Sequence, residues 1–254
     1  MGGPLVAEIL PGIWTAEVVQ PGFEVRSVAL LGRKRMLVFD TLLHPSDMQP
    51  FAGLADGREI VTVYSHADWD HIWGTAGLPH HGGEVVGHAA CAERFRTEVP
   101  GTLEERRAAE PGAWDDVELV PPTTLFEHRL EIDLHPWTLE LHHAPGHTRD
   151  SIVAWVPQLG LLLGGDAVED PWPLSGEGLP LAPWIESLLR WAAEPDLSLV
   201  LPSHGAPAGR KLLNRNISYL CALGGGRPYP VPEGTDPFYL EHHERDRQRY
   251  GHHA

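Results

Sequence analysis

The segment YSHADWDHIWG, residues 64–74, brings two histidines and two aspartates together within a few positions of one another. It follows EIVTVYS, a short β-branched run typical of a strand that is buried on both faces. His66 and Asp68 lie two residues apart on an extended segment, so their side chains leave the same face. Asp70 and His71 follow where the chain turns into a helix. The segment therefore predicts a cluster of metal ligands on a loop at the carboxyl end of a buried strand, where open α/β sheets place their sites.

Three more candidate ligands follow predicted strands later in the chain. They are His147 in APGHTRDS, Asp166 in LLGGDAV and His204 in LPSHGAP. Each has a glycine beside it, and glycine lets the backbone take positive φ and approach a metal cluster closely. A single His-Gly pair usually marks only a turn, but four such elements in order indicate one site assembled from several loops.

Hydrophobic periodicity predicts the arrangement of the chain. Apolar and polar residues alternate between turn signals from Ala7 to Asp40, which predicts antiparallel strands, and a helix is expected at 45–55. Helical stretches, AACAERFRTEV and TLEERRAAE, interrupt the pattern. A second β-rich half runs through RLEIDL, WTLELHHAP, SIVAWVP and LGLLLGGD and closes with a helix and the strand LSLVLPSHG. Two halves of similar plan predict two sheets packed face to face with helices outside.

The chain is expected to form one domain over residues 1–223, made of these two halves, with a final helix near 210–223. Residues 224–254 are rich in proline and glycine and have too little periodic apolar pattern to fold alone. This extension is expected to pack across the domain or onto a second subunit, which would allow a homodimer. Solvated side chains are expected for the histidines of this segment, which are His242, His243, His252 and His253.

The composition of the chain excludes some classes of binding partner. The formal charge of −16 provides no positive field to hold a phosphate backbone, so nucleic acid is not an expected partner. Neither a signal-peptide pattern nor a membrane-spanning apolar run is present, so the protein is expected to be cytoplasmic and not bound to a membrane. Cys91 and Cys221 stand in helical patterns, which predicts buried thiols rather than a disulfide or a metal site.

Four short motifs, HADWDH, PGHT, GGD and SHG, with VFDT upstream, resemble those of the metallo-β-lactamase superfamily of dinuclear metallohydrolases. The resemblance extends from about Ile9 to Leu223 and includes the spacing of the intervening strands. It implies an α/β fold, a four-layer αββα sandwich, with two divalent metal ions at one edge and no organic cofactor. It implies one ion held by His66, Asp68 and His147, a second held by Asp70, His71 and His204, and Asp166 as the bridge between them.

Asp68 departs from the family pattern. The superfamily usually has His-x-His-x-Asp-His, whereas this chain has His-x-Asp-x-Asp-His. Zinc is the expected ion, but a carboxylate is a hard ligand that shifts preference toward iron or manganese. It also lowers the net positive charge of a two-ion site by one unit, so attraction for strongly anionic substrates should weaken. Asp40, in VFDT, resembles an aspartate that supports a metal ligand in this family, and a simple strand-end turn residue is the alternative.

The expected activity is hydrolysis. Two divalent ions can share a water molecule, lower its pKa toward neutrality and polarise a carbonyl oxygen. Asp70 would act catalytically by orienting the resulting hydroxide. An ester, lactone or thioester is the expected substrate. Two alternatives stay open, an iron-dependent redox or dioxygenase-type enzyme and a non-catalytic metal-binding or regulatory protein.

The substrate is expected to be a small, partly apolar molecule, because tryptophans stand near the motifs. Trp69 and Trp73 flank the first motif, and Trp172 and Trp184 follow Asp166 where the family keeps a loop that faces the substrate. Core packing is favoured for Trp184, which begins an amphipathic helix. Surface or supporting positions are expected for His44, His143 and Arg149.

Overall fold

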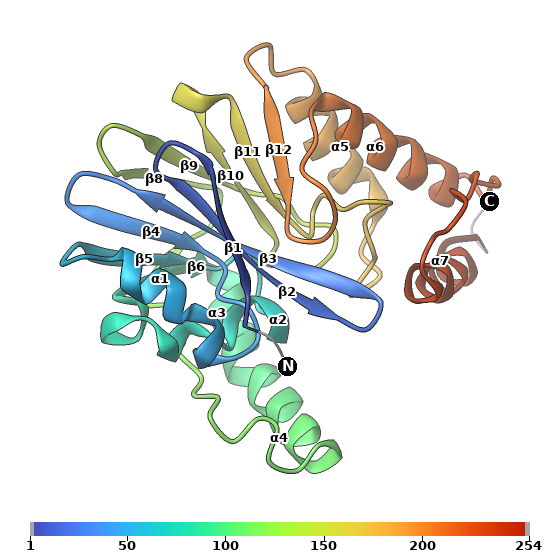
Figure 1. The fold of residues 1–254 in the computed structure, drawn as a ribbon. Helices are drawn as coiled ribbons and strands as arrows, with labels where there is room; N and C mark the ends of the chain where they lie inside the picture. Colours follow the sequence, from blue (N-terminus) through green and yellow to red (C-terminus); the bar gives the residue numbers. More distant parts are fainter. Residues whose placement is uncertain (1–2, 252–254) are drawn as a thin grey trace.

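Two β-sheets pack face to face with helices on their outer sides in this computed structural model, which describes residues 3–251 (Figure 1). The first sheet has seven strands in the order β1 to β7, and the second has five in the order β12-β11-β10-β9-β8. In the first sheet, neighbours run antiparallel as far as β4 and parallel from β4 to β7. In the second, only β11 and β12 are parallel.

The first half of the chain forms the first sheet and its helices. The strands are β1 (Leu5–Leu10), β2 (Ile13–Gln20), β3 (Phe23–Leu31), β4 (Arg35–Phe39), β5 (Glu59–Val63), β6 (Glu84–His88) and β7 (Thr124–Phe126). The helices are α1 (Gln49–Leu54), α2 (Trp69–Ile72), α3 (Ala89–Thr97) and α4 (Val99–Ala109). Short 3₁₀ turns are η1 (Pro45–Met48), η2 (Thr75–Gly77) and η3 (Pro79–Gly82).

The second half repeats this plan. Its strands are β8 (Arg129–Asp133), β9 (Thr138–His143), β10 (Ile152–Val156), β11 (Leu161–Gly165) and β12 (Leu199–Pro202). A 3₁₀ turn, η4 (Pro157–Leu159), joins β10 to β11. The helices are α5 (Leu181–Ala192), α6 (Arg210–Gly224) and α7 (Pro237–Tyr250).

Three clusters of buried apolar side chains separate four layers. One lies between the sheets and joins Phe39 and Val63 of the first to Leu141 and Leu163 of the second. A second fills the space between the first sheet and α1 to α4, and a third lies between the second sheet and α5 to α7. Strands with both faces covered bury nearly every residue, as β5 and β10 do. The αββα sandwich predicted from the sequence is confirmed.

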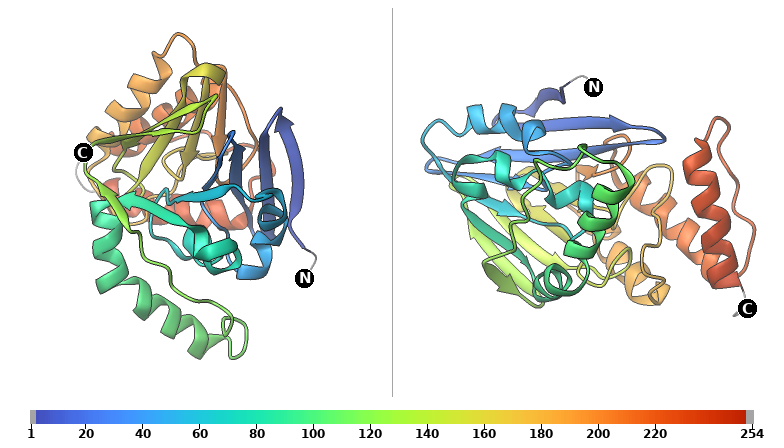
Figure 2. Two further views of the ribbon diagram at one scale, coloured as in Figure 1. Left: turned by 90° about the vertical axis from the view of Figure 1, so that its left-hand side faces the viewer. Right: turned by 90° about the horizontal axis from the view of Figure 1, so that it is seen from below.

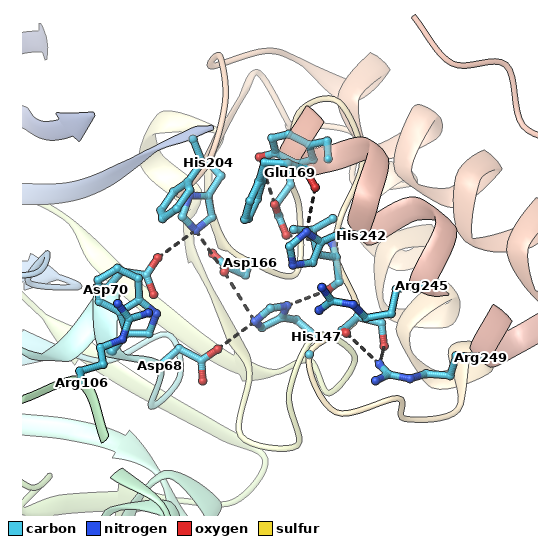
Figure 3. Close-up of a pocket in the computed structure, with 17 residues that line it drawn as sticks. Asp68, Asp70, Arg106, His147, Asp166, Glu169, His204, His242, Arg245 and Arg249 are labelled. Atoms are coloured by element: carbon cyan, nitrogen blue, oxygen red, sulfur yellow. Dashed lines mark hydrogen bonds and ion pairs between the residues drawn. The ribbon is translucent and has the colours of Figure 1, made fainter. Parts of the chain in front are cut away.

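Strand order brings the candidate ligands to one edge of the sandwich. β4 and β5 run parallel, so Asp40 after β4 and the motif after β5 leave the sheet side by side. β11 and β12 run parallel in the other sheet, so Asp166 and His204 also emerge together. His147 lies in the β9–β10 connection at the same edge (Figure 3).

The C-terminal extension is more ordered than its composition predicted. It contains α7, which packs against α6 (Figure 2). Tyr239 of α7 is buried in the third apolar cluster. The expectation of solvated histidines is wrong for His242 and His243, which are half-buried. The apolar residues of α7 stand mainly in its first turn, so no helical stripe marked it in the sequence. His252 and His253 lie outside the described residues.

Two smaller observations complete the fold. Cys91 is buried in α3 and Cys221 is half-buried in α6, and both thiols are free. No helix within residues 3–251 is long and apolar enough to cross a membrane.

The glycines beside the ligands serve two different purposes. Gly165 and Gly205 take positive φ, +51° and +93°, as the sequence predicted. Gly146 does not. A Cβ on Gly146 would lie 2.2 Å from the ring of Trp184, so this glycine makes room for a core tryptophan rather than for the metal cluster.

We expect Gly146→Ala to destabilise the metal-free protein by about 1–3 kcal/mol, because the added methyl overpacks the contact with Trp184. Urea unfolding followed by tryptophan fluorescence measures the change. Gly101→Ala is the matched control: nothing lies within 4 Å of its Cβ position, and it sits in α4, where alanine should gain roughly 0.5–1 kcal/mol. Equal stability of Gly146→Ala and the wild type would show that the loop relaxes freely.

Candidate metal centre

The seven predicted ligands meet at the edge of the sandwich. Figure 3 shows five of them, Asp68, Asp70, His147, Asp166 and His204. The seven form overlapping groups whose ligand atoms lie within 4.8 Å of one another. The groups are His66 with Asp68 and His147, Asp70 with His71 and His204, and His66 with His71 and Asp166. The first two match the two ligand sets implied by the family resemblance, and the third places Asp166 between them.

Distances within the cluster suit shared cations. Each of the four histidines has its Nε2 atom between 3.2 and 3.7 Å from carboxylate oxygens of the cluster. Two ligands of a tetrahedral ion at about 2.0–2.1 Å lie roughly 3.3 Å apart. The Asp166 carboxylate is within 3.7 Å of the Nε2 atoms of all four histidines. Its central place fits a bridging role.

The opposite nitrogen of each imidazole is held by a separate partner. The Nδ1 atoms of His147 and His204 donate to backbone carbonyls, of Leu174 at 2.7 Å and of Glu24 at 2.6 Å. Carbonyls only accept, so in the neutral ring the Nε2 lone pair faces the cluster. The Nδ1 atom of His66 lies 2.9 Å from the hydroxyl of Ser65.

Asp40 anchors the remaining imidazole. Its Oδ2 lies 3.0 Å from Nδ1 of His71, and its Oδ1 accepts from the backbone N–H of Ser65 at 2.7 Å. Asp40 is fully buried and has a φ of +61°. It therefore supports a candidate ligand and is not simply a turn residue.

Unpartnered atoms mark where cations fit. Nε2 of His66, Nε2 of His71 and Oδ1 of Asp166 are buried and have no hydrogen-bond partner among the described residues. Such atoms are costly unless something compensates them. Imidazole nitrogens and carboxylate oxygens are ligands for zinc, iron and manganese. The residues present therefore fit metal ions.

The charged groups of the cluster strongly shift one another's pKa values. Burial raises the pKa of Asp166, but the neighbouring charges of His204, His71 and His66 outweigh it and hold that pKa well below its usual range. Burial lowers the pKa of His204, but Asp166 outweighs it and raises the value to about 9. In the same way, Asp68 and Asp166 raise the pKa of His147 to about 10. In the absence of metal ions, protons bound to these histidines supply the positive charge that compensates the carboxylates.

Asp68 divides its two oxygens between the cluster and an arginine. Its Oδ2 lies 3.2 Å from Nε2 of His147 and 3.5 Å from Nε2 of His66. Its Oδ1 accepts from Nη2 of Arg94, on α3, at 2.5 Å. Asp68 thus presents one oxygen to the cluster. The charge count made from the sequence left out Arg94, which compensates the extra carboxylate.

Arg94 is itself part of a buried network. Its side chain is only 10% exposed and donates from Nη1 to Asp150 at 2.9 Å and from Nε to Glu98 at 2.9 Å. Asp150 is fully buried and accepts from the backbone N–H of Ala67 at 2.8 Å. The network therefore holds the motif loop at Ala67, between His66 and Asp68, and at Asp68 itself.

A cavity of about 360 Å³ opens onto the cluster. Five of the seven candidate ligands line it together with the apolar side chains of Phe23, Trp69 and Leu174. Of the four tryptophans considered, only Trp69 lines this cavity. The others, Trp73, Trp172 and Trp184, are fully buried in the core. Supporting or surface contacts away from the cavity are made by His44, His143 and Arg149.

Sequence reasoning missed several residues of the cavity. Glu169 is buried beside His147 and Asp166, and burial together with the Asp166 charge raises its pKa to about 8. Its place three residues after Asp166 was the available signal. Arg106 of α4 and the α7 side chains also line the cavity, and only tertiary packing places them there.

Comparisons with known proteins agree with this architecture. The family model described as Metallo-beta-lactamase superfamily matches residues 21–204. No curated protein matches the chain. Among solved structures, a metallo-beta-lactamase from Pontibacter korlensis is 19% identical, covering 86% of this chain and 99% of its own, with a TM-score of 0.68.

Two further structures are similar to the same extent. The mono-zinc form of the metallo-beta-lactamase FIM-1 from Pseudomonas aeruginosa is 20% identical, with a TM-score of 0.67 and coverage of 86% and 95%. A metallo-beta-lactamase from Erythrobacter litoralis, with beta mercaptoethanol in its active site, is 21% identical, with a TM-score of 0.64 and coverage of 86% and 96%. At these identities the likeness shows the fold.

We expect Arg94→Met to reduce the number of metal ions retained after dialysis against a weak chelator. The substitution leaves the negative charges of Asp68 and Asp150 without their buried cation, and losing one partner of a buried pair typically costs 3–5 kcal/mol. Metal stoichiometry by elemental analysis and the melting temperature of the metal-free protein measure the two effects separately.

Combining Arg94→Met with Asp68→His isolates the role of Arg94 at the cluster. A neutral imidazole needs no compensating cation, so the double variant should retain more metal than Arg94→Met alone. Arg96→Met is the control, because Arg96 is an exposed arginine on the same helix. Unchanged metal content in Arg94→Met would mean that Arg94 only stabilises the fold.

Proposed function

Because the chain belongs to the metallo-β-lactamase superfamily, we propose that it is a metal-dependent hydrolase that cleaves an ester, lactone or thioester bond. One observation carries the proposal. Four imidazoles and three carboxylates from separate loops turn their free ligand atoms toward one another at the floor of an open cavity. The Nδ1 atom of each imidazole is held by a backbone carbonyl, a hydroxyl or a carboxylate. Catalytic metal sites fix their histidine ligands in this way.

We assign two divalent ions to the site, with zinc expected first. The four imidazoles favour zinc, and the solved structure of FIM-1 is described as a mono-zinc form. Iron and manganese are the alternative ions, because the carboxylate of Asp68 is a hard ligand. When bound, two such ions lower the pKa of a water molecule toward neutrality and polarise the carbonyl oxygen.

The chain itself supplies a carboxylate that can orient the attacking water and an apolar wall beside it. Asp70 lines the cavity, its oxygens lying 3.7 Å from Nε2 of His71 and 3.6 Å from Nε2 of His204. From there its carboxylate can accept a hydrogen bond from the attacking water and fix its direction. Phe23 and Trp69 form an apolar wall beside it, which suits the acyl chain of a partly apolar small molecule.

We expect the purified protein to hydrolyse at least one member of a panel of aryl esters, lactones and thioesters, and to lose that activity on chelation. Zinc, manganese or iron should restore it. His204→Ala should lower turnover by at least about 10²-fold and reduce bound metal, since it removes a ligand rather than a surface group. His128→Ala is the control, because His128 lies outside the cavity and the cluster.

Two results would redirect the assignment. Oxygen consumption by an iron-loaded protein that hydrolyses nothing in the panel would favour the redox alternative. Tight metal binding with neither activity would favour a binding or regulatory protein.

Asp68→His should retain two metals and shift metal preference toward zinc, because an imidazole replaces a hard oxygen ligand. Competition between zinc and manganese, read out by elemental analysis, measures the shift. Asp68→Asn keeps the shape and removes the charge, so it should lower metal content at the site formed with His66 and His147. Wild-type metal content and identity in both variants would remove Asp68 from the ligand set.

A further inference from the structure

The cavity above the cluster has a second wall, built by α7 (Figure 3). The side chains that α7 contributes are Phe238, Tyr239, His242, Arg245 and Arg249. This helix lies beyond residue 204, where the family match ends. The family resemblance therefore says nothing about what this wall binds.

Several contacts fix α7 against the cavity. The buried Tyr239 donates its hydroxyl proton to Oε2 of Glu169 at 3.4 Å. The buried Asp246 accepts from the backbone N–H of Ser175 at 3.1 Å. Tyr250 donates to the carbonyl of Leu179 at 2.8 Å. The face of α7 toward the cavity is therefore set by the fold.

Arg245 and Arg249 occupy that face one helical turn apart. Four residues of α-helix rise about 6 Å, so both guanidinium groups can reach a single anionic group. Nη1 of Arg249 donates to the carbonyl of Ser175 at 3.0 Å and lies 3.9 Å from Oδ1 of Asp246. Its Nε and Nη2 atoms have no hydrogen bond among the described residues and can still donate to an anion. Arg245 is paired with Glu241 at 3.2 Å, and such a pair between exposed side chains is weak.

The placement of these cations stands out against the acidic chain. The net charge is −16, yet three arginines line this one cavity. Arg106 lies on the opposite side of the cluster, near Asp70, with its guanidinium 3.5 Å from the ring centroid of Trp69 (Figure 3). Arg247, on the same helix as Arg245, is paired with Glu244 and does not line the cavity.

We propose that Arg245 and Arg249 bind a carboxylate of the substrate, at the end opposite the bond that is cleaved. The planar guanidinium group of arginine can donate two parallel hydrogen bonds to a carboxylate. The substrate is then an ester, lactone or thioester with an apolar middle, which Phe23 and Phe238 contact, and an acidic end at α7. This inference rests on the proposed hydrolase function.

Adipate and hexanoate test the subsite by binding alone. Both can place one carboxylate on the zinc-loaded cluster, but only adipate carries a second one at the other end. Calorimetry with the zinc-loaded full-length protein should show adipate binding at least about tenfold more tightly than hexanoate. Arg245→Gln and Arg249→Gln should each reduce that preference several-fold, and added salt should weaken it.

Arg247→Gln is the matched control, with the same charge change on the outer face of the same helix. It should leave the adipate preference unchanged. Equal affinity for adipate and hexanoate, or an equal loss in Arg247→Gln and Arg245→Gln, would overturn the proposal. A loss confined to Arg106→Gln would also overturn it, since the anion would then lie beside α4.

A second arm separates this inference from the proposed function. Monophenyl adipate and phenyl hexanoate differ only in the terminal carboxylate, and the ratio of their kcat/KM values should fall in Arg245→Gln. An arginine-dependent preference for adipate without hydrolysis of any ester would support the subsite and overturn the hydrolase. Hydrolysis without any preference for the acidic ester would overturn the subsite alone. A phosphate-ended ester preferred over monophenyl adipate would overturn the choice of a carboxylate.

Discussion

Buried charge is the constraint around which this protein is arranged. Three carboxylates and four imidazoles crowd together at the edge of the sandwich, and most of them are almost completely withdrawn from solvent. Removing ions from water costs several kcal/mol for each unless opposite charges and hydrogen bonds compensate. The raised pKa values of His147 and His204 and the lowered pKa of Asp166 are consistent with this, because positive charge there, on protons or on metal ions, compensates the carboxylates. The parallel strand pairs β4–β5 and β11–β12 bring the loops that carry the cluster to one edge.

The same constraint accounts for the environment of Asp68. A carboxylate at this position adds a negative charge to an already anionic cluster, and Arg94 stands directly against it. Arg94 also joins α3 to Asp150 and so to the backbone of the motif loop. The unusual residue and its partner therefore act as one unit. The replacement of the usual histidine by Asp68 cannot be considered without Arg94, because Arg94 balances the charge of Asp68 and also holds the motif loop through Asp150.

Much of the fold could be predicted from the sequence because its signals are local. Strand alternation and the helix patterns depend on neighbouring residues, and they predicted two sheets packed face to face with helices outside. The motifs carried the family resemblance, which implied the four-layer αββα sandwich. The gathering of the candidate ligands followed from strand order in the same way. Arg94 and Arg106 carry no such signal, because helix packing alone brings them to the cluster. Glu169 is different, because it stands only three residues after Asp166. The sequence also gave no reason to place Trp172 in the core or to expect α7 in a segment rich in proline and glycine.

The contact between Tyr239 and Glu169 joins two stretches of chain with separate tasks. Every candidate metal ligand lies at or before His204, whereas the opposite wall of the cavity begins at Phe238. The candidate ligands and the α7 wall of the cavity are therefore encoded in separate stretches of the chain. On the inference above, substitutions at Arg245 and Arg249, which contact no candidate ligand, can alter which molecules bind without changing how the ions are held. Such an arrangement lets a lineage acquire new substrates while its reactive centre stays under unchanged selection.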